Sequence, residues 1–223
     1  MWTRWILGAG IAVSGAAMVA AAVPPWPLAS TSELAKGKFL IARPHAGGPV
    51  FHESVVLLLE YGSDGAMGLI INRPTEIALA RLLPDVETLR GRADFTFFGG
   101  PVDPHRVMLL FRSSDPPPES RRVARGIHVA GSFEELRTVV ESADPESHYR
   151  AYVGYAGWAM GQLEGEVVRG DWLIAPFEAS AVFEMDPEKV WQEFIDRSSG
   201  LQADRRRFRV PAAAGAGRSA PAA

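Results

Sequence analysis

An apolar run that stops at a polar, proline-ended turn constrains the fold of this chain more than any other feature. The run Gly68-Leu69-Ile70-Ile71 is followed at once by Asn72-Arg73-Pro74. Because proline has no N–H to donate to a sheet, this pattern indicates a buried strand that ends abruptly. Three further junctions have the same character: Ala42-Arg43-Pro44, Gly99-Gly100-Pro101-Val102, and Gly157-Trp158 through Gly161-Gln162-Leu163-Glu164. We expect a single hydrophobic interior to bring these four corners together.

Strand and helix signals are mixed along residues 31–203, without regular alternation, an internal repeat or a linker. Two apolar runs, 54–60 and 67–71, are joined by a turn that contains Asp64-Gly65, which predicts a β-hairpin. Helices are predicted from their N-terminal signals at Thr75, at Ser132 with Glu135, and at Asp186-Pro187, the last of these ending at Gly200. The mixture favours one compact domain of the α+β class over a doubly wound sheet.

The N-terminal residues 1–30 have the pattern of a targeting segment followed by a proline-rich linker. Residues 6–23 carry no charge, Arg4 precedes them, and Pro24, Pro25 and Pro27 follow. This pattern is typical of a cleaved signal peptide or an uncleaved membrane anchor, although the run is rich in Ala, Gly and Ser. We therefore expect a cell-envelope location with membrane contact through residues 6–23. The alternative is a cytoplasmic protein whose leader is a misassigned start or a non-targeting tail.

Charge and cysteine content exclude several classes of function. The chain has a formal charge of −3, but the charge is unevenly spread: residues 204–223 sum to +4 and Arg4 adds +1, so residues 31–203 carry −8 and the central domain is acidic. An acidic domain disfavours direct nucleic-acid binding, because phosphate contacts need Lys and Arg. The absence of cysteine excludes disulfides, thiolate nucleophiles and cysteine-ligated metals. Past its basic start, the C-terminal segment is rich in Ala and Gly, and we expect it to be disordered.

The corners supply the candidate residues of a ligand cleft: His45, His52, Asn72, Arg73, Gly99, Gly100, Trp158 and Gln162. Arg73 and Asn72 could bind an anion, and Gly99-Gly100 could cradle a phosphate. Each residue also has a purely structural alternative: Asn72 bonds nearby backbone, Arg73 meets a carboxylate, and the two glycines form a tight turn. For Trp158 the alternative is burial in the core, and we favour it over ligand stacking. Two histidines seven residues apart define no metal site, so we expect no metal and no cofactor. We assign no catalytic residue, because no nucleophile motif is present.

Five ordered motifs resemble the AlgH/YqgE family over about residues 33–200. They are the segments 37–44, 51–56, 65–74, 99–102 and 154–164. The resemblance implies a compact α+β domain whose mixed sheet is curled into a barrel-like core with peripheral helices. It implies no settled activity, since the family name reflects a proposed link to transcriptional regulation in bacteria. Two positions depart from the family pattern: Gly48-Pro49-Val50 replaces an acidic Asp-Pro pair, and Tyr61 stands where a histidine is common.

Two hypotheses of function follow. The first is a non-enzymatic regulatory or binding module with an unidentified protein or small-molecule partner, because no complete catalytic constellation accompanies the well-specified domain. The second is a small-anion-binding protein or hydrolase-like enzyme that uses the cleft formed by Asn72, Arg73, Gly99 and Gly100. We favour the first hypothesis, and with it a protein that is not an enzyme.

Overall fold

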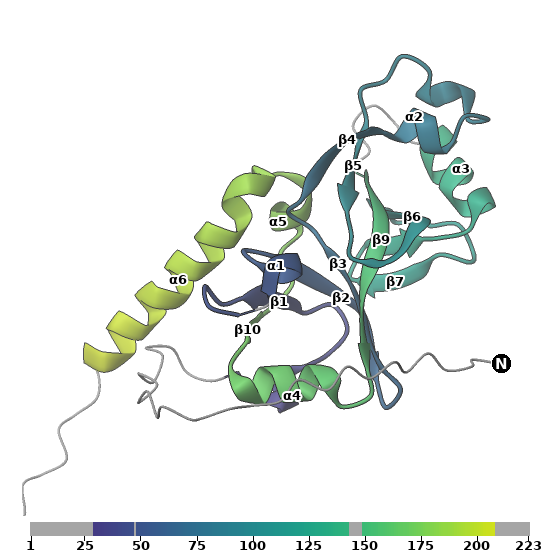
Figure 1. Cartoon of the computed structure of the whole chain (residues 1–223). Helices are drawn as coiled ribbons and strands as arrows, with labels where there is room; N and C mark the ends of the chain where they lie inside the picture. Colours follow the sequence, from purple (N-terminus) through teal and green to yellow (C-terminus); the bar gives the residue numbers. More distant parts are fainter. Residues whose placement is uncertain (1–28, 47, 143–148, 208–223) are drawn as a thin grey trace, which may run out of the picture.

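The computed structural model describes residues 29–46, 48–142 and 149–207 (Figure 1). The predicted leader and the Ala/Gly-rich part of the C-terminal segment lie outside these residues. The described strands are β1 Phe39–Ala42, β2 Val55–Gly62, β3 Gly65–Ile70, β4 Pro74–Ala78, β5 Phe95–Phe98, β6 Val102–Arg112, β7 Arg121–Ala124, β8 Ile127–Ala130, β9 Tyr149–Ala159 and β10 Trp172–Ala175. The helices are α1 Gly48–Phe51, α2 Leu79–Leu82, α3 Phe133–Ser142, α4 Gln162–Arg169, α5 Ala179–Phe183 and α6 Pro187–Arg207, with 3-10 turns η1 Thr31–Glu33 and η2 Glu87–Leu89.

The strands form one mixed sheet in the order β10-β1-β2-β3-β9-β6-β8-β7. A short branch, β4 paired with β5, joins this path where β5 runs parallel to β9; the other described strand pairs are antiparallel. The predicted α+β class and mixed, curled sheet are thus confirmed. The hairpin of β2 and β3 is also confirmed, with Gly62 opposite Gly65 at its tip.

The sheet curls without closing into a complete barrel. The segment before β1 lies between β2 and β7, two strands that are distant in sheet order. On one side the Gly37 N–H donates to the carbonyl of Leu58 in β2 at 2.8 Å. On its other side Gly37 lies against β7: a Cβ on this residue would be 2.9 Å from the Val123 carbonyl oxygen. Its φ of +80° also favours glycine. One edge strand of the sheet is therefore covered by the chain that enters β1.

Strand β9 joins the two parts of the sheet because it pairs with three partners. Its C-terminal half pairs with β3, from Ala156 opposite Gly68 to Ala159 opposite Gly65. Its N-terminal half pairs with β6 on one side and with β5 on the other. Almost every second residue of its middle is buried, as expected for a strand with core on one face.

Three hydrophobic clusters cover the faces of the sheet. The largest lies under α5 and α6, where Phe194 and Trp191 pack onto β1 and the Trp191 indole donates to the Ala42 carbonyl at 2.7 Å. A second cluster lies between the opposite face and α4, and a third is formed with α2, η2 and α3. Figure 1 shows α2 and α3 at one end of the sheet and α4 toward the other.

Two predicted helices differ from the structure. The segment after Thr75 begins as strand β4, because the Thr75 hydroxyl bonds to Thr96 of the neighbouring strand, and the helix starts only at Leu79. Helix α6 continues past Gly200 to Arg207. The capping box of Ser132 and Glu135 is present as predicted. No helix among the described residues is both long and apolar enough to span a membrane.

Candidate functional site

The Asn72 corner binds the main chain that leads into β2. The Asn72 Oδ1 accepts from the Val55 N–H at 2.8 Å, and its Nδ2 donates to the Glu53 carbonyl at 2.9 Å. Arg73 Nη2 donates to the His52 carbonyl at 2.6 Å, and burial lowers the Arg73 pKa. Glu53 has a positive φ of 52°, an unfavourable conformation for a residue with a side chain. The two side chains thus hold a strained turn in place, and the partner of Arg73 is a carbonyl instead of the carboxylate considered from the sequence.

His45 and His52 line one cavity of about 390 Å³, together with Pro44, Ala46, Gly48 and Pro49. Both imidazoles are exposed, and the nearest carboxylate to His52 is that of Glu53, at 4.0 Å from its Nδ1. Arg43 precedes Pro44 of this cavity in the chain. Its side chain is fully buried, and burial lowers its pKa to about 10. The described residues contain no group of three or more His, Cys, Asp or Glu side chains that could hold a metal ion.

The Gly99-Gly100 corner is packed against the backbone of β9. A Cβ on Gly99 would lie 2.2 Å from the Gly154 carbonyl oxygen, and one on Gly100 would lie 2.2 Å from the Tyr155 carbonyl carbon. Gly154 has a φ of +69°, and a Cβ on it would lie 2.3 Å from the Gly100 carbonyl oxygen. The Gly99 N–H donates to the Val153 carbonyl at 2.8 Å. These glycines therefore permit two backbones to touch, and the Gly99 N–H is already bonded to β9.

The Trp158 corner is an aromatic cluster built around one carboxylate. Glu166 Oε2 accepts from the indole N–H of Trp158 at 2.8 Å and from that of Trp172 at 2.9 Å. Its Oε1 accepts from the Gln162 amide at 3.0 Å, and the Gln162 Oε1 accepts from the Ala159 N–H. Trp158 is 5% exposed, as we favoured from the sequence. The Oε2 of Glu166 thus orients two buried indoles beneath α4, while its Oε1 is held by Gln162.

Backbone and ring contacts connect the corners with one another. Phe51 of α1, the residue before His52, stacks on Trp158 with ring centroids 5.8 Å apart. The Arg73 carbonyl accepts from the Phe98 N–H, and the Gly99 carbonyl accepts from the Ile70 N–H. The junctions are therefore linked through the middle of the sheet, but their side chains lie in separate places: the Asn72–Arg73 turn, the cavity lined by His45 and His52, and the aromatic cluster around Glu166. The single ligand cleft stays a prediction; its candidate residues are His45, His52, Asn72, Arg73, Gly99, Gly100, Trp158 and Gln162.

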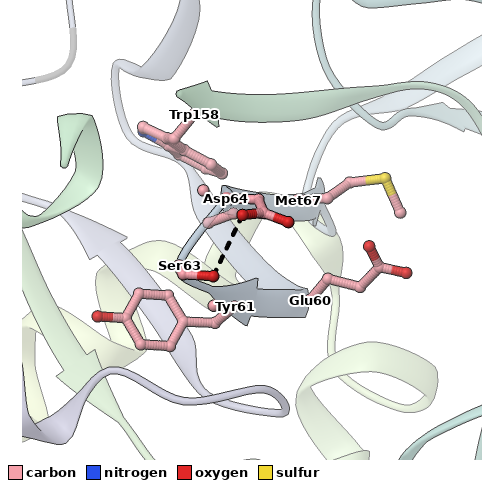
Figure 2. Close-up of a pocket in the computed structure, with 9 residues that line it drawn as sticks. Glu60, Tyr61, Ser63, Asp64, Met67 and Trp158 are labelled. Atoms are coloured by element: carbon pink, nitrogen blue, oxygen red, sulfur yellow. Dashed lines mark hydrogen bonds between the residues drawn. The ribbon is translucent and has the colours of Figure 1, made fainter. Parts of the chain in front are cut away.

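A second cavity, of about 370 Å³, lies at the tip of the β2–β3 hairpin and was missed in the sequence analysis. Figure 2 shows Tyr61 pointing to one side of the hairpin and Glu60 and Met67 to the other. The Tyr61 hydroxyl donates to Glu164 of α4 at 2.8 Å, and this bond raises the Tyr61 pKa. The Asp64 carboxylate also lines this cavity, and among the described residues it accepts only from the Ser63 hydroxyl. Its one sequence signal was the Asp-Gly turn.

The AlgH-like family model matches residues 39–202. This chain belongs to the AlgH-like family. A UPF0301 protein of Anaeromyxobacter dehalogenans is 39% identical over 181 residues, covering 77% of this chain and 91% of its own length. A UPF0301 protein of Chromobacterium violaceum is 41% identical over 158 residues, covering 68% and 83%.

Two solved structures share the fold. The solution structure of the AlgH protein from Pseudomonas aeruginosa has a TM-score of 0.63 and 29% identity, and the match covers 80% of this chain and 95% of that one. The crystal structure of protein DIP2367 from Corynebacterium diphtheriae has a TM-score of 0.62 and 22% identity over 74% and 87% of the two chains. These matches confirm the resemblance read from the motifs, and they assign no activity to the AlgH-like domain.

Proposed function

We propose that this AlgH-like chain is a non-enzymatic binding module that regulates or positions a partner at the cell envelope. The observation that carries the proposal is that the polar side chains at the corners are already engaged in holding the fold. Both ends of the Asn72 amide and both oxygens of Glu166 bond to the protein itself. A catalytic group must be free to meet its substrate, whereas these groups are committed to contacts that hold the fold.

Affinity capture from native cells tests the proposal. Full-length protein, cross-linked in cells and purified from solubilised envelopes, should recover a defined partner in fixed stoichiometry. The control is Tyr61→Phe, a change at the hairpin that removes only the hydroxyl bond to Glu164 and should leave the protein folded. Turnover of a metabolite by the purified chain alone, lost in a His52→Ala variant that keeps its stability, would overturn the proposal in favour of an enzyme.

The second candidate function is binding of a small anion in the cavity lined by His45 and His52. The observation that favours it is that these two imidazoles are exposed in one cavity while the half-buried Arg73 guanidinium bonds to the His52 carbonyl. Thermal-shift titration with phosphate, nucleotides and divalent metals tests this. Equal melting temperatures with and without each ligand, in wild type and in Arg73→Ala, would exclude it.

The envelope location is proposed from the N-terminal sequence. An uncharged run after Arg4 followed by a proline-rich linker supports export or anchoring. Fractionation of cells that carry the full chain or a chain lacking residues 1–23 tests it. A full-length protein found wholly in the cytosol would favour the alternative location.

A further inference from the structure

Cations gather where the segment before β1 meets the edge strand β7. Lys36 and Lys38 flank Gly37, whose backbone lies against Val123 of β7. Arg121 and Arg122 of the same strand are exposed beside it, as is Lys36. We call Lys36, Lys38, Arg121 and Arg122 the basic edge. Two of the three lysines of the whole chain belong to it.

The basic edge contains more positive charge than its neighbours neutralise. Burial and the nearby Arg121 and Arg122 guanidinium groups together lower the pKa of Lys36. Among the described residues, Arg121 is paired with Glu60 of the hairpin, whereas no described carboxylate lies within ion-pair distance of Lys36 or Arg122. Like charges held together on a domain that is acidic overall repel one another, and an external anion relieves that repulsion.

The position of the basic edge in the chain indicates which anion. The described domain begins at Ala29, and Leu34 anchors η1 in the cluster under α4. Five residues lie between Ala29 and Val23, the last residue of the uncharged N-terminal run. The six steps from Val23 to Ala29 span at most about 20 Å, so an anchored run would hold the start of the domain, and the basic edge that soon follows it in the chain, close to the bilayer surface. Anionic headgroups attract cations there with a range of about one Debye length, roughly 8–10 Å.

We propose that the basic edge docks the domain on an anionic phospholipid surface. The surface contributes charge attraction, while the N-terminal run contributes insertion, which is the two-signal arrangement that gives stable membrane attachment. The docking rests on the envelope location proposed above. Such docking would fix the orientation of the domain relative to the bilayer.

Lysine labelling of full-length protein on vesicles tests the docking directly. The protein is reconstituted into vesicles of phosphatidylcholine alone or with about 30% phosphatidylglycerol and treated with an amine-reactive reagent. Lys189 at the start of α6 is 80% exposed and serves as the internal reference. Labelling of Lys36 and Lys38 relative to Lys189 should fall at least about fivefold on anionic vesicles, since each cation near such a surface contributes about 1 kcal/mol. The protection should disappear in about 0.5 M salt.

Matched charge reversals separate docking from general electrostatics. Arg121→Glu with Arg122→Glu should abolish the protection of Lys36 and Lys38. Arg81→Glu with Arg90→Glu changes the net charge equally at the α2–η2 end and should leave the protection intact. Equal labelling on neutral and anionic vesicles would overturn the docking, as would saturable binding of a short DNA duplex through the same arginines. Failure of the chain to associate with neutral vesicles would instead count against the anchor, so the two proposals fail separately.

Discussion

Replacing Asn72 with alanine tests whether this residue holds the fold or awaits a ligand. The variant loses two hydrogen bonds, each with a net contribution of about 1 kcal/mol, and leaves the Val55 N–H without its acceptor. Val55 is fully buried, so that N–H cannot turn to solvent, and an unsatisfied buried donor costs about 1–3 kcal/mol. We therefore expect Asn72→Ala to lower the free energy of unfolding by about 2–4 kcal/mol.

Urea denaturation followed by tryptophan fluorescence and far-UV circular dichroism measures this loss. The midpoint should shift with an unchanged slope, and the melting temperature should fall by roughly 5–15 °C for a domain of this size. The control is Arg73→Ala, whose bond lies at the surface and whose loss should be about 1 kcal/mol or less. If Asn72→Ala were within about 0.5 kcal/mol of wild type, the structural assignment of Asn72 would be wrong.

Three further perturbations test two of the remaining corners and the start of α3. Gly154→Ala should lower the free energy of unfolding by about 3 kcal/mol or more, because a clash with the Gly100 carbonyl adds to the positive-φ strain. The control is Gly91→Ala, at a residue with a φ of +77° and open space around it, which should lower it by only about 1 kcal/mol. Glu166→Ala should cost about 2–4 kcal/mol and alter the near-UV circular dichroism of the two indoles, and an unchanged spectrum would contradict their shared acceptor. Burial alone would raise the Glu135 pKa, but the Ser132 and Gly131 amides bring it below its ordinary value. The stability that this carboxylate contributes is therefore present above about pH 4.5 and is lost as pH falls through its folded pKa. Wild type should exceed Glu135→Gln in free energy of unfolding by roughly 1 kcal/mol, and this difference should disappear in acid. A difference that does not depend on pH would refute this.

Local signals predicted the elements whose determinants lie within a few residues. The Asp64-Gly65 turn fixes the β2–β3 hairpin, and the Ser132–Glu135 capping box fixes the start of α3. The helix predicted from Thr75 was wrong in its first turn because the competing partner, Thr96, is 21 residues away. A tertiary hydrogen bond of this kind overrides local helix propensity and leaves no mark in the nearby sequence.

The roles of the candidate residues show the same limit. Asn72 at a strand end suggested either a local turn or an anion, and its actual partners lie 17 and 19 residues earlier. The two glycines of Gly99-Gly100 suggested a cradle, but the decisive contact is with Gly154, which only the strand order reveals. Trp158 was assigned correctly to the interior, since its size made burial the stronger expectation.

Strand β9 has a consequence for how this domain comes apart. Because it shares ladders with β3, β5 and β6, neither half of the sheet retains a complete hydrogen-bonding partner once β9 is withdrawn. Amide protons near its midpoint should exchange with deuterium at the rate of global unfolding, and pulling on this strand should rupture the domain in one step. A split of the polypeptide just before Tyr149 would yield two fragments that are each unable to fold until they meet.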